Sequence, residues 1–146
     1  TTSSIITHVL NNSSFPVNAF LGGISSNLNS NFLLNKKAET VVVEADEYDR
    51  SFLTLSPNIA VVTSMDADHL DIYGEHSYLT ESFEKYVAKL PSDGILIKRK
   101  GLLVEHNNTL EYAVGEKADY YATNINIVNT NGKYLRPSAP TVSFNN

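Results

Sequence analysis

The chain has 146 residues, of which 42% are hydrophobic, 10% aromatic and 18% charged, which is typical of one globular domain. Its net charge of −5 argues against a nucleic-acid-binding protein, and the absence of cysteine excludes disulfides, thiolate nucleophiles and cysteine-ligated metals. No apolar run reaches the ~20 residues of a membrane span, and no signal peptide is evident. We therefore expect a soluble, cytoplasmic protein with no membrane or nucleic-acid partner.

The first hundred residues predict an α/β arrangement. Helices are predicted at about 5–10 and 75–90, strands at 17–21, 40–43, 58–63 and 94–97, and a Ser- and Asn-rich loop or turn region at 24–35. The apolar spacing of the second helix ends at Pro91. The β-branched runs at 40–43 and 58–63 are typical of neighbouring parallel strands that are covered on both faces.

The last third of the sequence predicts short strands and turns. Strands are predicted at 102–104, 109–114 and 120–128, and Asn131-Gly132 predicts a hairpin turn. The fold class we expect is α/β, with a mostly parallel sheet flanked by helices and a small antiparallel β portion towards the C-terminus. The sequence enters a helix directly after Thr1-Thr2 and ends without a clear element, so we expect a piece of a longer chain.

Acidic residues gather after two of the predicted strands. Half of the sixteen acids lie in residues 44–75, namely Glu44, Asp46, Glu47, Asp49, Asp66, Asp68, Asp71 and Glu75. Arg50 is the one basic residue there, and His69 lies within the second cluster. In open α/β sheets ligands bind beyond the carboxyl ends of the strands, and oxygen ligands with one histidine suit Mg²⁺ or Mn²⁺. The pattern favours a metal- or phosphate-binding edge; solvated loop carboxylates are the alternative.

These two segments resemble the Mur ligase family, in its central ATP-binding domain. Segment 42–52, VVEADEYDRSF, is similar to the EADE stretch of that family, and segment 63–73, TSMDADHLDIY, to its DHxD stretch. Thr1-Thr2 resembles the end of the family's phosphate-binding loop, and the resemblance extends over roughly 1–135. The glycines and lysine of that loop, the N-terminal UDP-binding domain and the C-terminal amino-acid-binding domain are not in the sequence. The resemblance therefore implies that residues 1–146 are a fragment of the central domain.

The resemblance also implies a chemistry. In this family ATP phosphorylates the carboxylate of a muramic acid, here UDP-N-acetylmuramic acid, and the amine of L-alanine attacks the resulting acyl phosphate. Catalysis of phosphoryl transfer is mostly positioning and charge neutralisation, which is why Mg²⁺ or Mn²⁺ is expected as a cofactor beside ATP. The implied protein is a bacterial peptidoglycan-precursor ligase, and the fragment alone is expected to be inactive.

Individual roles follow from the same resemblance. Glu44 and His69 would be the catalytic residues, both as metal ligands, and Asp68 and Asp71 would orient them. Contacts to the sugar nucleotide are assigned to Asp46, Glu47, Arg50, Gly22 and Gly23, and contacts to ATP to Thr1 and Thr2. Three histidines, His8, His76 and His106, receive no role, and that of Lys85 on the second helix stays open.

Three alternatives remain. A metal-dependent phosphoesterase also uses acidic and histidine side chains at strand ends, but it would need more converging ligands than His69 and its neighbours supply. A non-catalytic sugar-nucleotide-binding or protein-binding module would keep the fold without the chemistry. A murein-recycling ligase of the same family would attach a peptide in place of L-alanine.

Overall fold

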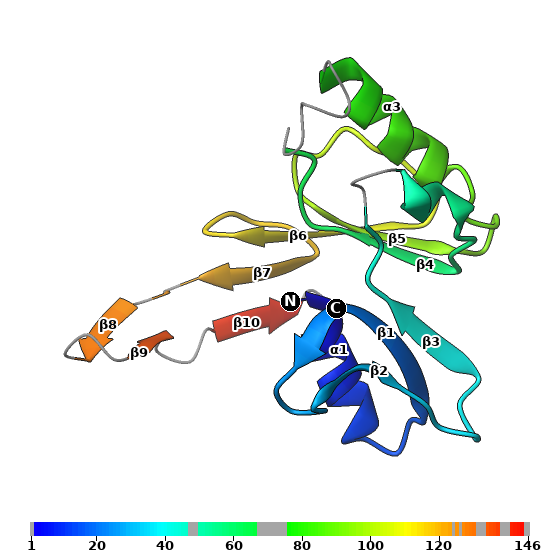
Figure 1. The fold of residues 1–146 in the computed structure, drawn as a ribbon. Helices are drawn as coiled ribbons and strands as arrows, with labels where there is room; N and C mark the ends of the chain where they lie inside the picture. Colours follow the sequence, from blue (N-terminus) through cyan, green and yellow to red (C-terminus); the bar gives the residue numbers. More distant parts are fainter. Residues whose placement is uncertain are drawn as a thin grey trace. The chain divides into compact units, whose positions relative to one another are not determined.

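A computed structural model describes residues 2–46, 50–66, 76–123, 125, 127–130, 134–137 and 141–144 (Figure 1). The side chains of residues 76 and 77, and those beyond residue 125, are not described. The chain divides into two compact units, Thr1–Phe52 and Leu53–Asn146. The short 3₁₀ helix η1 (Ser51–Thr54) spans the division.

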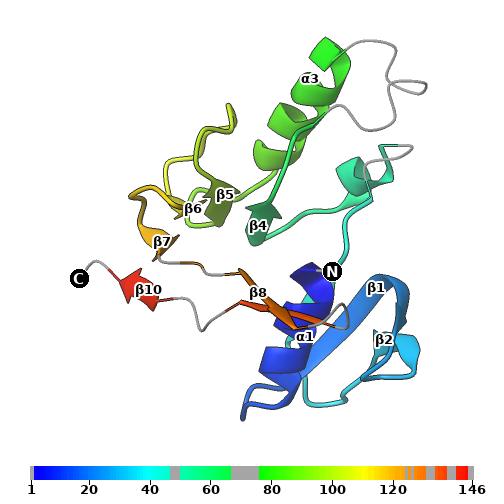
Figure 2. The same cartoon turned by 90° about the vertical axis from the view of Figure 1, so that its left-hand side faces the viewer.

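Unit 1 is a three-stranded sheet with one helix on it. Its elements are α1 (Thr2–Asn11), β1 (Val17–Ser25), β2 (Ser30–Leu33) and β3 (Thr40–Val43), and the strand order is β2-β1-β3. β1 pairs antiparallel with β2 and parallel with β3. α1 packs against β1 and β3 (Figure 1 and Figure 2). The core of the unit includes the fully buried Val17 and Ala19 of β1.

The loop or turn region predicted at 24–35 is confirmed only as a turn at 26–29 and is too long as predicted, because β1 continues to Ser25 and β2 begins at Ser30. The Ser and Asn residues form only the turn between these strands. In that turn Leu28 N donates to Ser25 O at 3.1 Å, and Asn29 adopts a positive φ of 48°, which Asn tolerates better than most residues. Residues 24–35 are therefore a β-hairpin rather than an open loop.

Strand β3 does not have the burial that its sequence predicts. Val41 and Val43 are 51% and 38% exposed, and Phe20 and Phe32 on the same face are also half exposed. β4 (Ile59–Val62) likewise exposes Ile59 and Val61 on one face. β3 ends the strand order of the sheet in unit 1 and β4 ends that of the sheet in unit 2, so the expected pairing of the two strands as neighbours stays a prediction.

Unit 2 contains the main parallel sheet. Besides β4 it has α3 (His76–Val87), β5 (Ile95–Arg99), β6 (Thr109–Val114), β7 (Tyr120–Thr123) and β10 (Thr141–Phe144), in strand order β10-β7-β6-β5-β4. β4 to β7 are parallel, and β10 is antiparallel to β7. α3 buries Leu79 and Val87 at helical spacing and ends before Pro91. The predicted α/β class with a mostly parallel sheet is confirmed.

The C-terminal portion combines correct and incorrect predictions. β8 (Ile127–Thr130) and β9 (Tyr134–Pro137) form the antiparallel pair predicted around Asn131-Gly132. β6 and β7, however, extend the parallel sheet instead of starting the antiparallel portion. Residues 102–104 are not a strand, because the carbonyls of Leu102 and Val104 accept hydrogen bonds from the buried Lys98 ammonium at 2.9 Å each. Within the described ranges no helix is long and apolar enough to cross a membrane.

Candidate functional site

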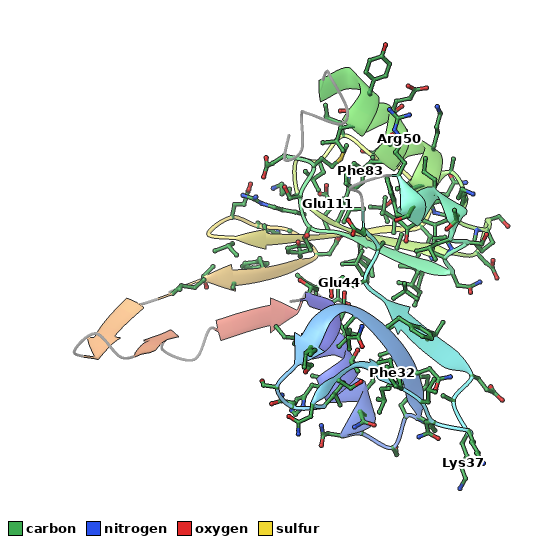
Figure 3. All side chains as sticks on the ribbon, viewed as in Figure 1. Phe32, Lys37, Glu44, Arg50, Phe83 and Glu111 are labelled. Atoms are coloured by element: carbon green, nitrogen blue, oxygen red, sulfur yellow. The ribbon has the colours of Figure 1, made fainter. Side chains whose placement is uncertain are left out.

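Glu44 directly follows β3 and is tied to the neighbouring strand. Its backbone N–H donates to Phe20 O at 2.9 Å, which continues the parallel ladder for one residue beyond β3. Its side-chain Oε2 accepts a hydrogen bond from Gly22 N at 3.0 Å. Figure 3 shows this side chain at the end of β3. The parallel register of β1 and β3 thus brings two of the predicted site residues, Glu44 and Gly22, into contact.

Gly22 is close to the Glu44 carboxylate, whereas Gly23 is not. A Cβ built on Gly22 would lie 3.4 Å from Glu44 Cδ, so any larger side chain there would meet the carboxylate. A Cβ on Gly23 would meet nothing within 4 Å. Gly22 therefore leaves room for the Glu44 side chain to fold back onto β1.

Glu44 and Gly23 line a hollow of about 530 Å³ within unit 1. The remaining lining comes from the first two turns of α1 and from the β1–β2 hairpin, namely Ser4, Ile5, His8, Ile24, Ser25, Ser26 and Asn27. A volume of this size is in the range of small-molecule sites. The N-terminal part of α1 and the carboxyl end of β3 therefore both border this hollow.

His8 and Asn27 are members of this hollow that the sequence did not single out. Asn27 Nδ2 lies 3.4 Å from His8 Nδ1, and Asn12 Nδ2 lies 3.2 Å from the same ring nitrogen. Ser4 and His8 are four residues apart and therefore share a helix face, which is the one signal the sequence offered. Asn27 lies 19 residues from His8, and no local pattern indicates that contact.

Asp46 and Arg50 frame the segment after Glu44. Asp46 O accepts hydrogen bonds from Phe52 N and Ser51 Oγ, each at 3.2 Å, which fixes the chain where η1 begins. Arg50 has a positive φ of 62°, an uncommon conformation for a residue with a Cβ, and both Asp46 and Arg50 are exposed. The structure thus places both side chains on the surface of unit 1 after β3.

The segment after β4 begins with a local turn. Ser64 Oγ donates to Asp66 Oδ2 at 2.5 Å and accepts from Asp66 N at 3.0 Å. Met65 between them is buried. These bonds hold the described start of the second acidic cluster in a defined path.

Several predicted site residues lie outside the described residues. They are Thr1, Glu47, Asp68, His69 and Asp71, so the expected approach of His69 to Glu44 stays a prediction. Among the residues that the structure describes, no group of three or more acidic, histidine or cysteine side chains could hold a metal ion. Glu44 does fit the expected cofactor, because a carboxylate oxygen is the kind of ligand that Mg²⁺ prefers. Lys85 pairs with Glu81 at 2.7 Å on the exposed side of α3.

Comparison with known proteins defines the class. Residues 1–141 match the family model of the Mur ligase middle domain, and the chain belongs to the Mur ligase family. It is 50% identical over 127 residues to the UDP-N-acetylmuramate–L-alanine ligase of Christiangramia forsetii, covering 87% of this chain. It is 47% identical over 136 residues to the enzyme of the same name from Parabacteroides distasonis, covering 90% of this chain. The chain spans 27% and 29% of those two relatives.

Solved structures show the same fold. The UDP-N-acetylmuramate-alanine ligase of Thermotoga maritima matches 84% of this chain and 28% of its own, with a TM-score of 0.69 and 26% identity. The UDP-N-acetylmuramate:L-alanyl-gamma-D-glutamyl-meso-diaminopimelate ligase of Neisseria meningitides matches 86% of this chain and 45% of its own, with a TM-score of 0.72 and 21% identity. The family match favours a ligase fold over the phosphoesterase alternative.

Proposed function

We propose that the chain forms the central part of an ATP-dependent ligase that joins L-alanine to UDP-N-acetylmuramic acid. The observation that carries this proposal is 50% identity over 127 residues to an enzyme named for that reaction. ATP would transfer its γ-phosphoryl group to the substrate carboxylate. The amine of L-alanine would then attack the acyl carbon, and inorganic phosphate would leave. Because both substrates of the first step are cytoplasmic nucleotides, the reaction belongs in the bacterial cytoplasm.

In this proposal the start of α1 binds the phosphates of ATP. α1 begins at Thr2, and backbone N–H groups at a helix N-terminus stabilise phosphate anions. Ser4 and Ile5 of that first part of the helix line the same hollow as Glu44. Thr1 and Thr2 would therefore contact the transferred phosphoryl group close to the Glu44 carboxylate.

Glu44 and His69 would hold Mg²⁺ or Mn²⁺ beside those phosphates. Such a cation would neutralise the negative charge of the phosphoryl group and of the substrate carboxylate as they approach each other. The backbone N–H of Gly22 supports the role of Glu44, since it fixes one carboxylate oxygen at 3.0 Å. Asp68 and Asp71 would orient the ligands, as carboxylates commonly do for histidines that bind metals.

The sugar nucleotide would lie over the surface formed after β3. Asp46, Glu47 and Arg50 are proposed as its contacts, with Gly22 and Gly23 allowing its close approach to the backbone. The exposed position of Asp46 and Arg50 supports this assignment. Arg50 would complement the negative charge of the diphosphate.

The amine substrate is proposed to be L-alanine rather than a peptide. The curated relatives that are 43–50% identical to this chain are named as L-alanine ligases. The peptide-adding enzyme from Neisseria meningitides is 21% identical and shows the fold alone. Turnover of the complete ligase with L-alanine and with the L-alanyl-gamma-D-glutamyl-meso-diaminopimelate tripeptide decides between them, and a preference for the tripeptide would reassign the substrate.

The test of the proposed chemistry is Glu44→Gln in the complete ligase. We expect acyl-phosphate formation, trapped with hydroxylamine, to fall by about 10²-fold or more, because a charge that stabilises the transferring phosphoryl group is lost. The matched control is Glu39→Gln, an exposed carboxylate just before β3, which should leave the rate unchanged. Trapping at the wild-type rate by the Glu44→Gln variant would refute the role of Glu44.

A further inference from the structure

We propose that Ser51 is a positioning residue for the sugar nucleotide. Its hydroxyl group would hold Arg50 in the backbone conformation from which the guanidinium group binds the diphosphate. This role rests on the proposed function, in which Arg50 contacts that diphosphate. Ser51 itself has no role in the motifs or in the chemistry described above.

The backbone of Arg50 has a conformation that is unfavourable for a residue with a side chain. Its φ of 62° lies in the left-handed region, where the Cβ of an L-residue crowds the following carbonyl oxygen. Glycine would adopt this conformation without that penalty. An arginine at such a position therefore needs neighbouring contacts that hold its backbone in place.

The carbonyl oxygen of Asp46 supplies such contacts. Asp46 O accepts one hydrogen bond from Ser51 Oγ and one from Phe52 N, each at 3.2 Å. These two bonds use both lone pairs of the carbonyl oxygen. The residue that follows Arg50 is thereby tied to a fixed acceptor, while the Arg50 side chain is exposed.

The two bonds to Asp46 O differ in what their loss would change. The bond from Phe52 N belongs to the backbone of a residue that is 3% exposed, so this anchor stays in any Ser51 variant. Ser51 is exposed, and its hydroxyl bond acts on the residue directly after Arg50. The free energy of one such bond is comparable to the penalty of a left-handed residue. Loss of the hydroxyl would therefore release Arg50 while unit 1 stays folded.

Release of Arg50 would weaken the binding of a diphosphate. A guanidinium group binds phosphate oxygens through two parallel hydrogen bonds, which requires a defined orientation. When only a fraction of the molecules has the competent conformation, the apparent affinity falls by that fraction. The Ser51 hydroxyl should therefore affect the binding of the sugar nucleotide and not the binding of ATP or the chemical step.

The test is Ser51→Ala in the complete ligase. We expect KM for UDP-N-acetylmuramic acid to rise about fivefold, the effect of one lost hydrogen bond, with kcat and KM for ATP unchanged. Ser51→Thr keeps the hydroxyl and should have a KM close to that of the wild type. Ser13→Ala is the matched control, because the exposed Ser13 Oγ also donates to a backbone carbonyl, Leu10 O, at 2.7 Å. It should leave all three constants unchanged.

A double-mutant cycle shows whether Ser51 acts through Arg50. In an Arg50→Ala background, Ser51→Ala should raise KM no further, because the side chain that it positions is absent. Equal rises in both backgrounds would overturn the inference. An unchanged KM in Ser51→Ala alone would also overturn it, as would a joint fall in kcat and in the unfolding midpoint, which indicates a structural role.

Failure of the proposed function would look different. If the wild-type ligase formed no product from ATP, UDP-N-acetylmuramic acid and L-alanine, the function would be wrong whatever Ser51 does. The hold on Arg50 would then be tested in this chain by the Cα and Hα chemical shifts of Arg50, which depend on φ and ψ. Left-handed shifts in the wild type and in Ser51→Thr that are lost in Ser51→Ala would support it. Left-handed shifts that persist in Ser51→Ala, or that are absent from the wild type, would overturn it.

Discussion

Two charged side chains, one in each unit, are held in contrasting ways. Lys98 of unit 2 is 3% exposed, and its ammonium donates to Leu102 O, Val104 O and Glu105 Oε1 at 2.8–2.9 Å. Those three bonds use every proton that a lysine ammonium has. Glu44 of unit 1 is partly exposed at the wall of a hollow, where Gly22 N–H fixes one of its oxygens.

The contrast separates a structural charge from a candidate functional one. The bonds of Lys98 all lead back into its own unit, where they hold residues 102–105 against β5. The position of Glu44 beside a hollow of ligand size is typical of a group that meets a substrate or cation. We therefore expect replacement of Lys98 to lower the stability of the protein and replacement of Glu44 to lower the activity of the complete ligase.

The largest effect on stability is expected for Lys98→Met. Loss of the ammonium leaves the Leu102 and Val104 carbonyls without their donor, so the free energy of unfolding should fall by about 3 kcal/mol. Urea denaturation followed by circular dichroism measures the change. Lys100→Met is the matched control, since Lys100 is a more exposed member of a pair with Glu116 and should cost less than about 1 kcal/mol. Equal losses of unfolding free energy for both variants would show that Lys98 contributes no more to stability than an exposed lysine.

A smaller effect, on activity rather than on stability, is expected for Gly22→Val. The added methyl groups would meet the Glu44 carboxylate, which lies 3.4 Å from the Cβ position, and would displace it. We expect kcat of the complete ligase to fall about tenfold, the effect of moving a positioned charge, while its unfolding midpoint changes little. Steady-state kinetics and thermal unfolding measure the two quantities. Asn31→Val, also on a β-strand of unit 1, is the control. If Gly22 had a purely structural role, Gly22→Val would lower the stability and leave kcat unchanged.

The smallest effect concerns a neutral buried group in unit 2. Burial raises the pKa of the Tyr86 hydroxyl above its ordinary value of 10.0. Above pH 10 the unfolded state therefore loses this proton before the folded state does, so the stability falls as the pH rises from 10 towards the raised folded pKa. Tyr86→Phe should flatten this fall in urea denaturation between about pH 9 and 11. Tyr78→Phe, on the exposed side of α3, should leave the slope unchanged.

Much of the fold was accessible from the sequence because its signals are local. The β-branched run 40–43 forms β3, and the helical spacing of Leu79 and Val87 forms α3. The prediction failed at 102–104, where the carbonyls of an apolar run accept hydrogen bonds from Lys98, four and six residues earlier in the chain. It failed also for β2, whose Asn and Ser residues resemble a loop although Phe32 pairs with Phe20.

The candidate site was accessible as separate residues but not as contacts. Motif resemblance named Glu44 and Gly22, yet their bond joins positions 22 residues apart and follows from the register between β1 and β3. His8 and Asn27 carry no motif, so the hollow they line could be found only once α1 and the hairpin were placed together. Sequence spacing reports what lies on one element, whereas a site depends on how elements pack.

The exposed valines of β3 have a practical consequence for work on unit 1. Val41 and Val43 lie on one face of a strand that ends the strand order of its sheet, and apolar side chains at such a position favour pairing between molecules. Glu39 and Glu44 flank the strand, and carboxylates at such positions act as gatekeepers because copies stacked in register would repel each other. Neutralising Glu44 removes one of these repelling carboxylates. Reaction rates of Glu44 variants should therefore be measured on fractions shown to be monodisperse.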